Sequence, residues 1–201
     1  MLPDVALFPL NAVLFPGGVM PLRIFEARYM DMVRDCMQKE QSFGVCLIVK
    51  GAEVGGAADH EPVGCLAKIV DWDMQQLGLL HIRTIGRQRF RMLERRVQKD
   101  GLIRADVQPL AADPEVALPE NYAACGVLIR RLVQDLEKRE DDPGKRMVAQ
   151  PYEFDSAAWV SNRLCEFLPI PLRAKHKLME LDDPLVRLSL VHQFLQQRQA
   201  I

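Results

Sequence analysis

Two different periodicities divide this sequence, and the change between them constrains the fold more than any other feature. In the first half, short apolar runs alternate with polar residues and are separated by Pro and Gly, which is typical of β-strands and turns. In the second half, apolar residues recur at three- and four-residue spacing, which is typical of amphipathic helices. A connector that contains Pro and Ala, 110–119, lies between them. The sequence therefore predicts an α+β protein with one domain at 1–114 and a second at 115–201.

The first half predicts six or seven short strands around one helix. β-Branched residues or a strict alternation of apolar and polar residues mark the strands, and a Gly-containing loop at 51–62 interrupts them. This spacing is typical of a small barrel or sandwich, and we predict a mainly antiparallel β-barrel. The predicted strands are 5–8, 12–15, 43–49, 64–71, 80–84, 87–92 and 102–107.

Residues 24–37 predict the single helix of this half. Apolar residues recur there at helical spacing, while Glu26, Arg28 and Asp31 fall on another face. We expect the apolar face to cover an open end or face of the strands, which would otherwise leave apolar surface and backbone groups in water. The apolar residues of this helix are Phe25, Tyr29, Met32, Val33, Cys36 and Met37.

The second half predicts a bundle of four helices. Asp155 is the expected N-cap of the second helix, because an aspartate side chain accepts hydrogen bonds from free N–H groups at a helix start. Asp183 is the expected cap of the fourth, with Pro184 at the first helical position, where no N–H is needed. The helices are predicted at 122–136, after Asp155, at 172–181 and after Asp183, the last with Leu185, Leu188, Val191 and Leu195 as its buried stripe.

The overall charge gives this chain no general attraction to nucleic acid or to an anionic membrane. Its 26 basic residues are balanced by 27 acidic ones, and 49% of its residues are hydrophobic, as in an ordinary globular protein. The N-terminal residues lack the basic and apolar regions of a secretory signal, and no stretch is apolar for long enough to span a bilayer. We therefore expect a cytoplasmic protein that needs no membrane partner.

The cysteines and histidines do not have the spacing of a metal site. The five cysteines are far apart and form no C-x-x-C pair, which favours small buried thiols over disulfides or zinc ligands. Two alternatives stay open: a metal site that joins Cys46 or Cys65 to His81, and a catalytic pair of His81 with Cys65 on adjacent strands. Neither has a supporting motif, so we expect no metal and no cofactor.

The sequence also lacks the common catalytic motifs. Gly144-Lys145 is followed by Arg146 and is not preceded by the glycine of a phosphate-binding loop. No G-x-S-x-G or H-E-x-x-H motif is present, and the acidic pairs Asp141-Asp142 and Asp182-Asp183 fall at helix ends, where they are expected to cap. We therefore predict no catalytic residues and a protein that is not an enzyme.

A series of short motifs resembles the N-terminal domain of Lon proteases. The motifs occur in the same order with consistent gaps, and the chain ends in a segment similar to the helical closing segment of that family. Cys65 stands where Thr is more usual in the family. The motifs are Phe8-Pro9-Leu10, Leu14-Phe15-Pro16-Gly17, Pro21-Leu22, Ile24 to Tyr29, Phe43-Gly44-Val45, Gly64 to Ala67, Gly86 with Arg89-Phe90, and Leu181 to Pro184 with Arg187-Leu188.

This resemblance implies a PUA-like antiparallel β-barrel with one covering helix, followed by a C-terminal helical bundle. It also implies a module that recognises protein substrates and assists assembly, here as a stand-alone form without the ATPase and peptidase modules of Lon. The expected partners are unfolded or extended polypeptides, and full-length Lon protease is a further expected partner. Gly64 and Gly86 would permit sharp bends where a barrel curves.

The candidate polypeptide-binding residues are Phe15, Met20 and Met30. Methionine adapts to varied apolar partners, and an aromatic ring offers a large contact area. Core packing is the alternative for Phe15, as it is for Phe25, Tyr29 and Phe90, and the helical stripe favours a core role for Met32.

RNA binding is the alternative function, although nucleic acid is not the partner that we expect. In the run 87–92, alternation places Arg87, Arg89 and Arg91 on one solvated strand face, and Phe90 and Met92 on the other. Such a row of arginines could contact phosphates, but an ordinary solvated face explains it as well. PUA-like folds bind RNA in other proteins, which supports this alternative only by analogy.

Overall fold

The computed structural model describes residues 1–201, except for the side chain of Pro143, and its contacts divide the chain into unit 1 (Met1–Ala111) and unit 2 (Ala112–Ile201). Strands form most of unit 1 and helices most of unit 2, as the two periodicities predict. Unit 1 contains β1 (Leu2–Leu10), β2 (Val19–Ile24), α1 (Ala27–Gln38), β3 (Phe43–Lys50), β4 (Asp59–Gln76), β5 (Leu79–Val97) and β6 (Ile103–Pro109). Unit 2 contains the short 3₁₀ helices η1 (Glu120–Tyr122) and η2 (Pro143–Lys145) and the helices α2 (Ala123–Glu137), α3 (Ala157–Phe167), α4 (Leu172–Glu180) and α5 (Pro184–Gln197).

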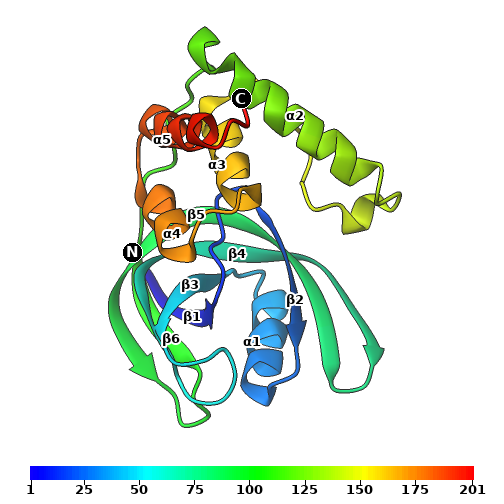
Figure 1. The fold of residues 1–201 in the computed structure, drawn as a ribbon. Helices are drawn as coiled ribbons and strands as arrows, with labels where there is room; N and C mark the ends of the chain where they lie inside the picture. The colour runs from blue at the N-terminus through cyan, green and yellow to red at the C-terminus, as the bar shows by residue number, and fades with distance from the viewer. The chain divides into compact units, whose positions relative to one another are not determined.

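The strands of unit 1 form a six-stranded mixed sheet in the order β2-β5-β4-β3-β1-β6 (Figure 1). β6 also pairs with β5, so the pairings β5-β4-β3-β1-β6-β5 make a closed circuit and β2 is added outside it. The pairs are antiparallel except β1 with β3, which is parallel. The predicted class, α+β, is therefore confirmed, and the expectation of a mainly antiparallel arrangement needs this one exception.

Some predicted strands differ from the observed ones. The runs 80–84 and 87–92 are parts of one long strand, β5. The predicted strand at 12–15 is wrong, because these residues form an irregular segment that leads into a turn at Pro16–Gly17. There Gly18 N–H donates to the Phe15 carbonyl (3.0 Å), and Gly17 N–H donates to the Gly86 carbonyl (2.8 Å). The side chains of Leu14 and Phe15 are both buried in this segment, so the sequence shows an apolar run although the residues form no strand.

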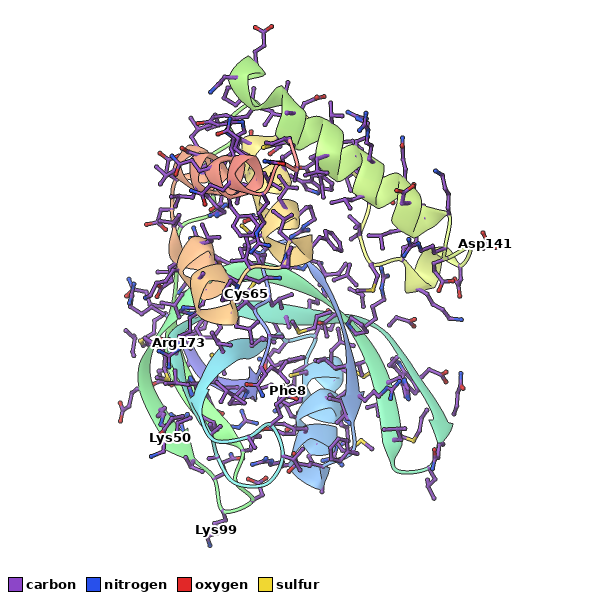
Figure 2. All side chains as sticks on the ribbon, viewed as in Figure 1. Phe8, Lys50, Cys65, Lys99, Asp141 and Arg173 are labelled. Atoms are coloured by element: carbon purple, nitrogen blue, oxygen red, sulfur yellow. The ribbon has the colours of Figure 1, made fainter. Side chains whose placement is uncertain are left out.

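The core of unit 1 lies between the sheet and α1. Tyr29, Met32, Val33 and Cys36 of α1 are buried there, as the helical period predicts, and the rings of Tyr29 and Phe8 lie 4.1 Å apart. Phe8 and Cys65 belong to this cluster, whereas Lys99 in the β5–β6 turn extends away from it (Figure 2). The helix therefore covers one side of the strands, which is the role that its amphipathic pattern predicts.

Two glycines make space for one aromatic ring in the second cluster of unit 1. Phe90 is fully buried and lies opposite Gly64 in the β4–β5 ladder. A Cβ at Gly64 would lie 2.8 Å from Phe90 Cζ and would also overlap the Val45 carbonyl oxygen, and a Cβ at Gly44 would lie 2.7 Å from the same ring atom. Both positions therefore need glycine for close packing.

In unit 2, α3 packs against α2, α4 and α5. Its buried residues include Val160 and Leu164, as predicted, but its N-cap is Ser156 and not Asp155. The Ser156 side chain accepts a hydrogen bond from Trp159 N–H (3.3 Å). Asp183 caps α5 through Leu185 N–H (2.8 Å) with Pro184 at the first helical position, which confirms that prediction.

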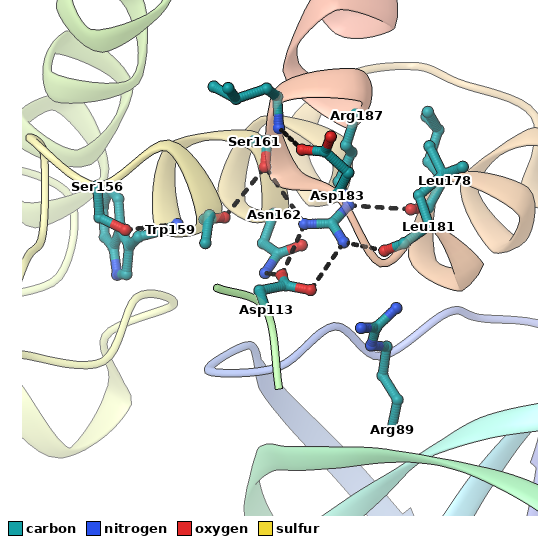
Figure 3. A network of polar contacts seen from close by, with 12 residues as sticks. Arg89, Asp113, Ser156, Trp159, Ser161, Asn162, Leu178, Leu181, Asp183 and Arg187 are labelled. Carbon is teal, nitrogen blue, oxygen red and sulfur yellow. Dashed lines mark hydrogen bonds and ion pairs between the residues drawn. The ribbon is translucent and has the colours of Figure 1, made fainter. Parts of the chain in front are cut away.

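A buried ion pair joins the start of unit 2 to its helices (Figure 3). The Arg187 guanidinium on α5 donates to both carboxylate oxygens of Asp113, at 2.7 and 3.1 Å. Its remaining N–H groups donate to the Leu178 and Leu181 carbonyl oxygens and to the Ser161 hydroxyl, and Asn162 of α3 donates to the same carboxylate. This network holds the segment before η1 against α3, α5 and the end of α4, and both charges are paired although both side chains are buried.

None of the helices in the described part of the chain combines the length and the apolar character that crossing a lipid bilayer requires.

Candidate functional site

An apolar groove of about 250 Å³ lies beside the start of α1 in unit 1. One wall comes from β2 and the residues that follow it, and the other comes from the exposed loop after β3. The buried rings of Phe8 and Tyr29 line it from the core side. The groove is lined by Phe8, Leu10, Pro21, Leu22, Arg23, Ile24, Phe25, Glu26, Tyr29, Glu53 and Val54.

Two large apolar side chains of this groove reach solvent. Phe25 is 55% exposed and Val54 is 57% exposed. The prediction that Phe25 belongs to the buried stripe of the helix is wrong, because Glu26 is the N-cap and the helical repeat begins only at Ala27. The residues before the N-cap do not follow the helical period, so Phe25 is free to face the groove.

The loop that forms the second wall is held to the rest of unit 1 by few polar contacts. The Glu53 side chain accepts a hydrogen bond from Asn11 N–H (2.6 Å), and the Glu26 side chain accepts one from Gly55 N–H (3.4 Å). Glu26 also pairs with Arg28 at 3.0 Å, and Arg28 donates to the Gly101 carbonyl (2.9 Å). The wall that carries Val54 is therefore adjustable, whereas the Phe25 wall continues directly into a helix packed on the core.

The predicted polypeptide-binding residues lie outside this groove. Phe15 is fully buried, so its ring does not reach the surface. Met20 of β2 and Met30 of α1 are partly buried and pack against the main core cluster. Met32 is buried, as predicted, and so are Tyr29 and Phe90. One sequence signal indicated that Phe25 could lie at a groove: it directly precedes Glu26, a residue that can begin a helix. The helical spacing of the apolar residues concealed this signal, because Phe25 fits the same spacing.

The predicted solvent-exposed strand face of Arg87, Arg89 and Arg91 is not formed. Arg87 and Arg91 are exposed, but Arg89 is 1% exposed and its guanidinium donates to the Ala111 carbonyl (3.1 Å). Between the pairs Cys65–Arg89 and Ala67–Gly86, β5 contains one residue more than β4. This bulge interrupts the alternation between Arg87 and Arg89. Arg89 and Phe90 point to opposite faces of β5 and both are buried, so the prediction of one continuous exposed arginine face is wrong.

The two open alternatives for His81 are not supported by its position. His81 is exposed and lies opposite Asp73, whereas Cys65 is buried and lies opposite Arg89. Positions 81 and 89 of β5 are separated by about 25 Å at the rise of an extended strand, and Cys46 lies at the same end as Cys65, opposite Gly64. His81 is therefore not placed to serve Cys65 as a base or to share a metal ion with Cys46 or Cys65. Among the residues that the structure describes, no group of three or more His, Cys, Asp or Glu side chains is arranged to hold a metal ion.

All five cysteines are buried thiols outside any disulfide, and we expect them to resist alkylation in the folded protein. Burial raises the pKa of the Cys36 and Cys125 thiols to about 11 and that of Cys165 to about 12, so almost no reactive thiolate is present at neutral pH. Maleimide labelling followed by mass spectrometry is expected to modify none of the five at pH 7 within minutes, and all five in denaturant. A single cysteine that labels rapidly in the folded protein would contradict their interpretation as structural thiols.

Comparisons with known proteins identify the family. The family model of the ATP-dependent protease La (LON) substrate-binding domain matches residues 4–197. The crystal structure of a Lon N-terminal domain protein from Xanthomonas campestris aligns with a TM-score of 0.77 and 32% identity, over 96% of this chain and 98% of that one. The N-terminal domain of a Mycobacterium avium complex Lon protease, with a TM-score of 0.59 and 14% identity over 96% and 98% of the two chains, shares the fold.

Longer proteins match as well. The Lon protease of Anaeromyxobacter dehalogenans is 23% identical over 192 residues, which are 95% of this chain and 22% of that protein. Protein cereblon of Gallus gallus is 36% identical over 115 residues, which are 56% of this chain and 24% of that protein. The chain thus spans about a quarter of the length of these relatives. On the match over residues 4–197, this chain belongs to the family of the Lon protease substrate-binding domain.

Proposed function

We propose that this chain is a non-enzymatic module that binds unfolded or extended polypeptides, in the manner of a substrate-recognition domain for protein quality control. The observation that carries the proposal is the apolar groove with the exposed Phe25 ring, in a chain of the Lon substrate-binding family. The proposal also includes full-length Lon as a partner and the cytoplasm as the compartment.

The groove has the chemistry that such binding needs. An apolar side chain of an extended polypeptide would lie against Phe25 and Val54 and remove both from water, which contributes about 25 cal/mol for each Å² of apolar surface buried. Charged side chains of both signs, Arg23, Glu26 and Glu53, also line the groove and favour polar neighbours of that side chain. One adjustable wall would admit side chains of different size, which suits a module with many clients.

The proposal also includes the finer architecture. The closed circuit of strand pairings supports a PUA-like barrel for unit 1, and the packing of α3 against three other helices supports a helical bundle for unit 2. The first domain would then extend to about residue 114 and the second would begin at about residue 115.

Replacing Phe25 with Ala is expected to weaken binding of an unfolded polypeptide by about tenfold or more, because exposed aromatic residues at apolar grooves contribute most of the binding energy. The measurement is fluorescence anisotropy with a labelled model protein that has been reduced, alkylated and so kept unfolded. The matched control is Leu93→Ala, since Leu93 on β5 is 53% exposed and lies outside the groove.

Two results would count against the proposal. The first is that the wild-type protein fails to retain unfolded protein at micromolar concentration. The second is that Phe25→Ala and Leu93→Ala reduce binding equally. Circular dichroism of both variants checks that they fold, and neither substitution is expected to lower the free energy of unfolding by more than about 1 kcal/mol, because both side chains are half exposed.

We do not propose RNA binding. The burial of Arg89 leaves Arg87 and Arg91 as the two exposed members of the predicted arginine set, and the net charge of the chain is −1. Two phosphate contacts contribute little to affinity at physiological salt.

A further inference from the structure

The exposed side of helix α5 carries no carboxylate, ammonium or guanidinium group. In α5 (Pro184–Gln197), which the structure describes throughout, Arg187 is the one Asp, Glu, Lys or Arg residue, and it is buried in the ion pair with Asp113. A helix at a protein surface ordinarily places charged residues on the face opposite its core. The solvent side of α5 instead consists of apolar, Ser and Gln residues: Val186, Ser189, Leu190, Gln193, Phe194 and Gln197.

Large apolar side chains on this side of α5 reach solvent. Val186 is 46% exposed, Leu190 is 45% exposed, and Phe194 is partly exposed. The three residues follow one another at four-residue spacing, so they form one row along the helix, which we name the α5 ridge. The helix is therefore apolar on two sides, because its other side is buried in unit 2 through Leu188, Val191 and Leu195.

An apolar groove of about 440 Å³ lies beside the α5 ridge, between α4 and α5. Both helices pack on α3, and the buried side chains of Ile170 and Val191 line the groove from the core side. Among the described residues that line it, Lys177 is the one charged residue, and its ammonium group is paired with the Glu180 carboxylate at 2.7 Å. Each copy of the chain thus presents an apolar ridge and an apolar groove side by side.

The charged residues around the α5 ridge lie at the two ends of the helix and have opposite signs. Asp182 and Asp183 precede the first helical residue, and Arg198 follows the last. The Arg198 guanidinium lies over the Phe194 ring, 4.6 Å from its centroid, which places it at the end of the ridge. Asp182 is as far before Leu190 in the sequence as Arg198 is after it. An antiparallel copy of α5 with a two-fold axis at Leu190 therefore brings Arg198 of each copy opposite Asp182 of the other.

This pattern selects a second copy of the chain as the occupant of the groove. A two-fold contact brings like residues together near its axis, so a charged centre would repel itself, whereas the centre of the α5 ridge is uncharged. Gln193 and Gln197 have amide groups that both donate and accept hydrogen bonds, which suits a surface that meets its own copy. A parallel copy is disfavoured, because it would place Asp182 beside Asp182 and Arg198 beside Arg198.

We infer that two copies of this chain associate through their α5 ridges, antiparallel about a two-fold axis at Leu190, with the ridge of each copy against the α4–α5 groove of the other. Val186 of one copy then faces Phe194 of the other, and the opposite charges at the helix ends fix the register. This contact lies in unit 2 and does not rest on the proposed function. A dimer would offer clients two Phe25 grooves in one assembly, which raises the avidity for a long unfolded chain.

The first test measures self-association of the full chain by sedimentation velocity from about 1 to about 100 μM. We expect a monomer–dimer equilibrium that Leu190→Lys weakens at least about tenfold, because two ammonium groups would meet at the axis. The matched control is Val127→Lys, since Val127 on α2 is 49% exposed and lies outside the groove. Val127→Lys is expected to leave the dimer unchanged, and circular dichroism checks that both variants fold.

Charge reversal tests the register. Arg198→Asp places carboxylates opposite each other at both ends of the pair, and Asp182→Arg places guanidinium groups there, so each variant alone is expected to weaken its dimer about threefold or more. In a mixture of the two variants, the introduced aspartate meets the introduced arginine, and Asp182 of one chain still meets Arg198 of the other. We therefore expect the mixture to recover wild-type association as a heterodimer.

A cross-link tests the axis. The five native cysteines are buried, so Leu190→Cys supplies an accessible thiol that would lie next to its own copy. Oxidation with copper phenanthroline is expected to join two Leu190→Cys chains by a disulfide, whereas Val127→Cys at the same concentration stays largely monomeric.

The outcomes separate this contact from client binding. A wild-type chain that stays monomeric at every concentration, or equal dimerisation of Leu190→Lys and Val127→Lys, overturns the inference. Failure of Leu190→Cys to cross-link, or of the mixed charge variants to recover, overturns the two-fold arrangement. A monomeric chain whose binding of unfolded protein is weakened by Leu190→Lys would assign the groove to clients and overturn the inference as well. In each case the proposed function still depends on Phe25 alone.

Discussion

Replacing Asp113 with Ala is expected to destabilise unit 2 by about 3–5 kcal/mol. The substitution leaves the Arg187 guanidinium buried without its carboxylate, and an uncompensated buried charge costs about this much. The carbonyl oxygens of Leu178 and Leu181 still accept hydrogen bonds from Arg187, but they cannot neutralise its charge. Asn162 also loses its acceptor on the Asp113 carboxylate.

The two tryptophans make this measurement specific, since Trp72 lies in unit 1 and Trp159 in unit 2. In a Trp72→Phe background, urea unfolding followed by fluorescence reports on unit 2 through Trp159. The control is Asp135→Ala, which removes an exposed ion pair with Lys138 and is expected to cost less than about 1 kcal/mol.

A further variant separates buried charge from lost packing. Combining Asp113→Ala with Arg187→Met removes both charges, so the double variant is expected to be more stable than Asp113→Ala alone. A loss below about 1 kcal/mol for Asp113→Ala, or a double variant less stable than the single one, would show that this ion pair does not hold unit 2 together.

Replacing Gly64 with Ala is expected to destabilise unit 1 by about 3 kcal/mol or more, at the upper end of the penalties for overpacking a core. The new methyl group would overlap the Val45 carbonyl oxygen on the adjacent strand and lie 2.9 Å from Cys46 Sγ. A backbone oxygen in a strand ladder cannot move away without breaking that ladder, so the strain is not relieved by a change of side-chain rotamer.

Two other glycines provide graded comparisons. At Gly44 the close atoms belong to the side chains of Leu7 and Phe90, so Gly44→Ala is expected to cost less than Gly64→Ala and to be partly rescued by Phe90→Leu. Gly56 has open space around it, and Gly56→Ala is expected to change stability by less than about 1 kcal/mol. Unfolding is followed by Trp72 fluorescence in a Trp159→Phe background. If Gly64→Ala and Gly56→Ala proved equally stable, the packing of Phe90 against Gly64 would not matter.

Where local rules apply, the sequence predicted the structure well. The helical period of 24–37 placed Tyr29, Met32 and Val33 in the core, and the Asp183-Pro184 pair marked the start of α5. The class α+β followed from the change of periodicity near residue 115. These features depend on residues close together in the chain, where spacing and capping chemistry determine the outcome.

The candidate sites were predicted less well, because they depend on register and on partners far apart in the chain. Arg89 was assigned to solvent by an alternation that a single extra residue of β5 interrupts, and no local signal marks such a bulge. Phe25 was assigned to the core because its spacing fits the helix that begins just after it. The ion pair between Asp113 and Arg187 joins positions far apart in sequence, where each residue by itself resembles an ordinary surface charge.

The sequence by itself determined which segments are strands and helices, where most of them start, and the family to which the chain is similar. Tertiary structure decided where β5 carries a bulge, which aromatic ring reaches the surface, and which charges are buried in pairs. The physical reason is that secondary structure follows from backbone preferences and short-range patterns, whereas exposure and strand pairing are set by contacts between segments that the order of residues does not bring together.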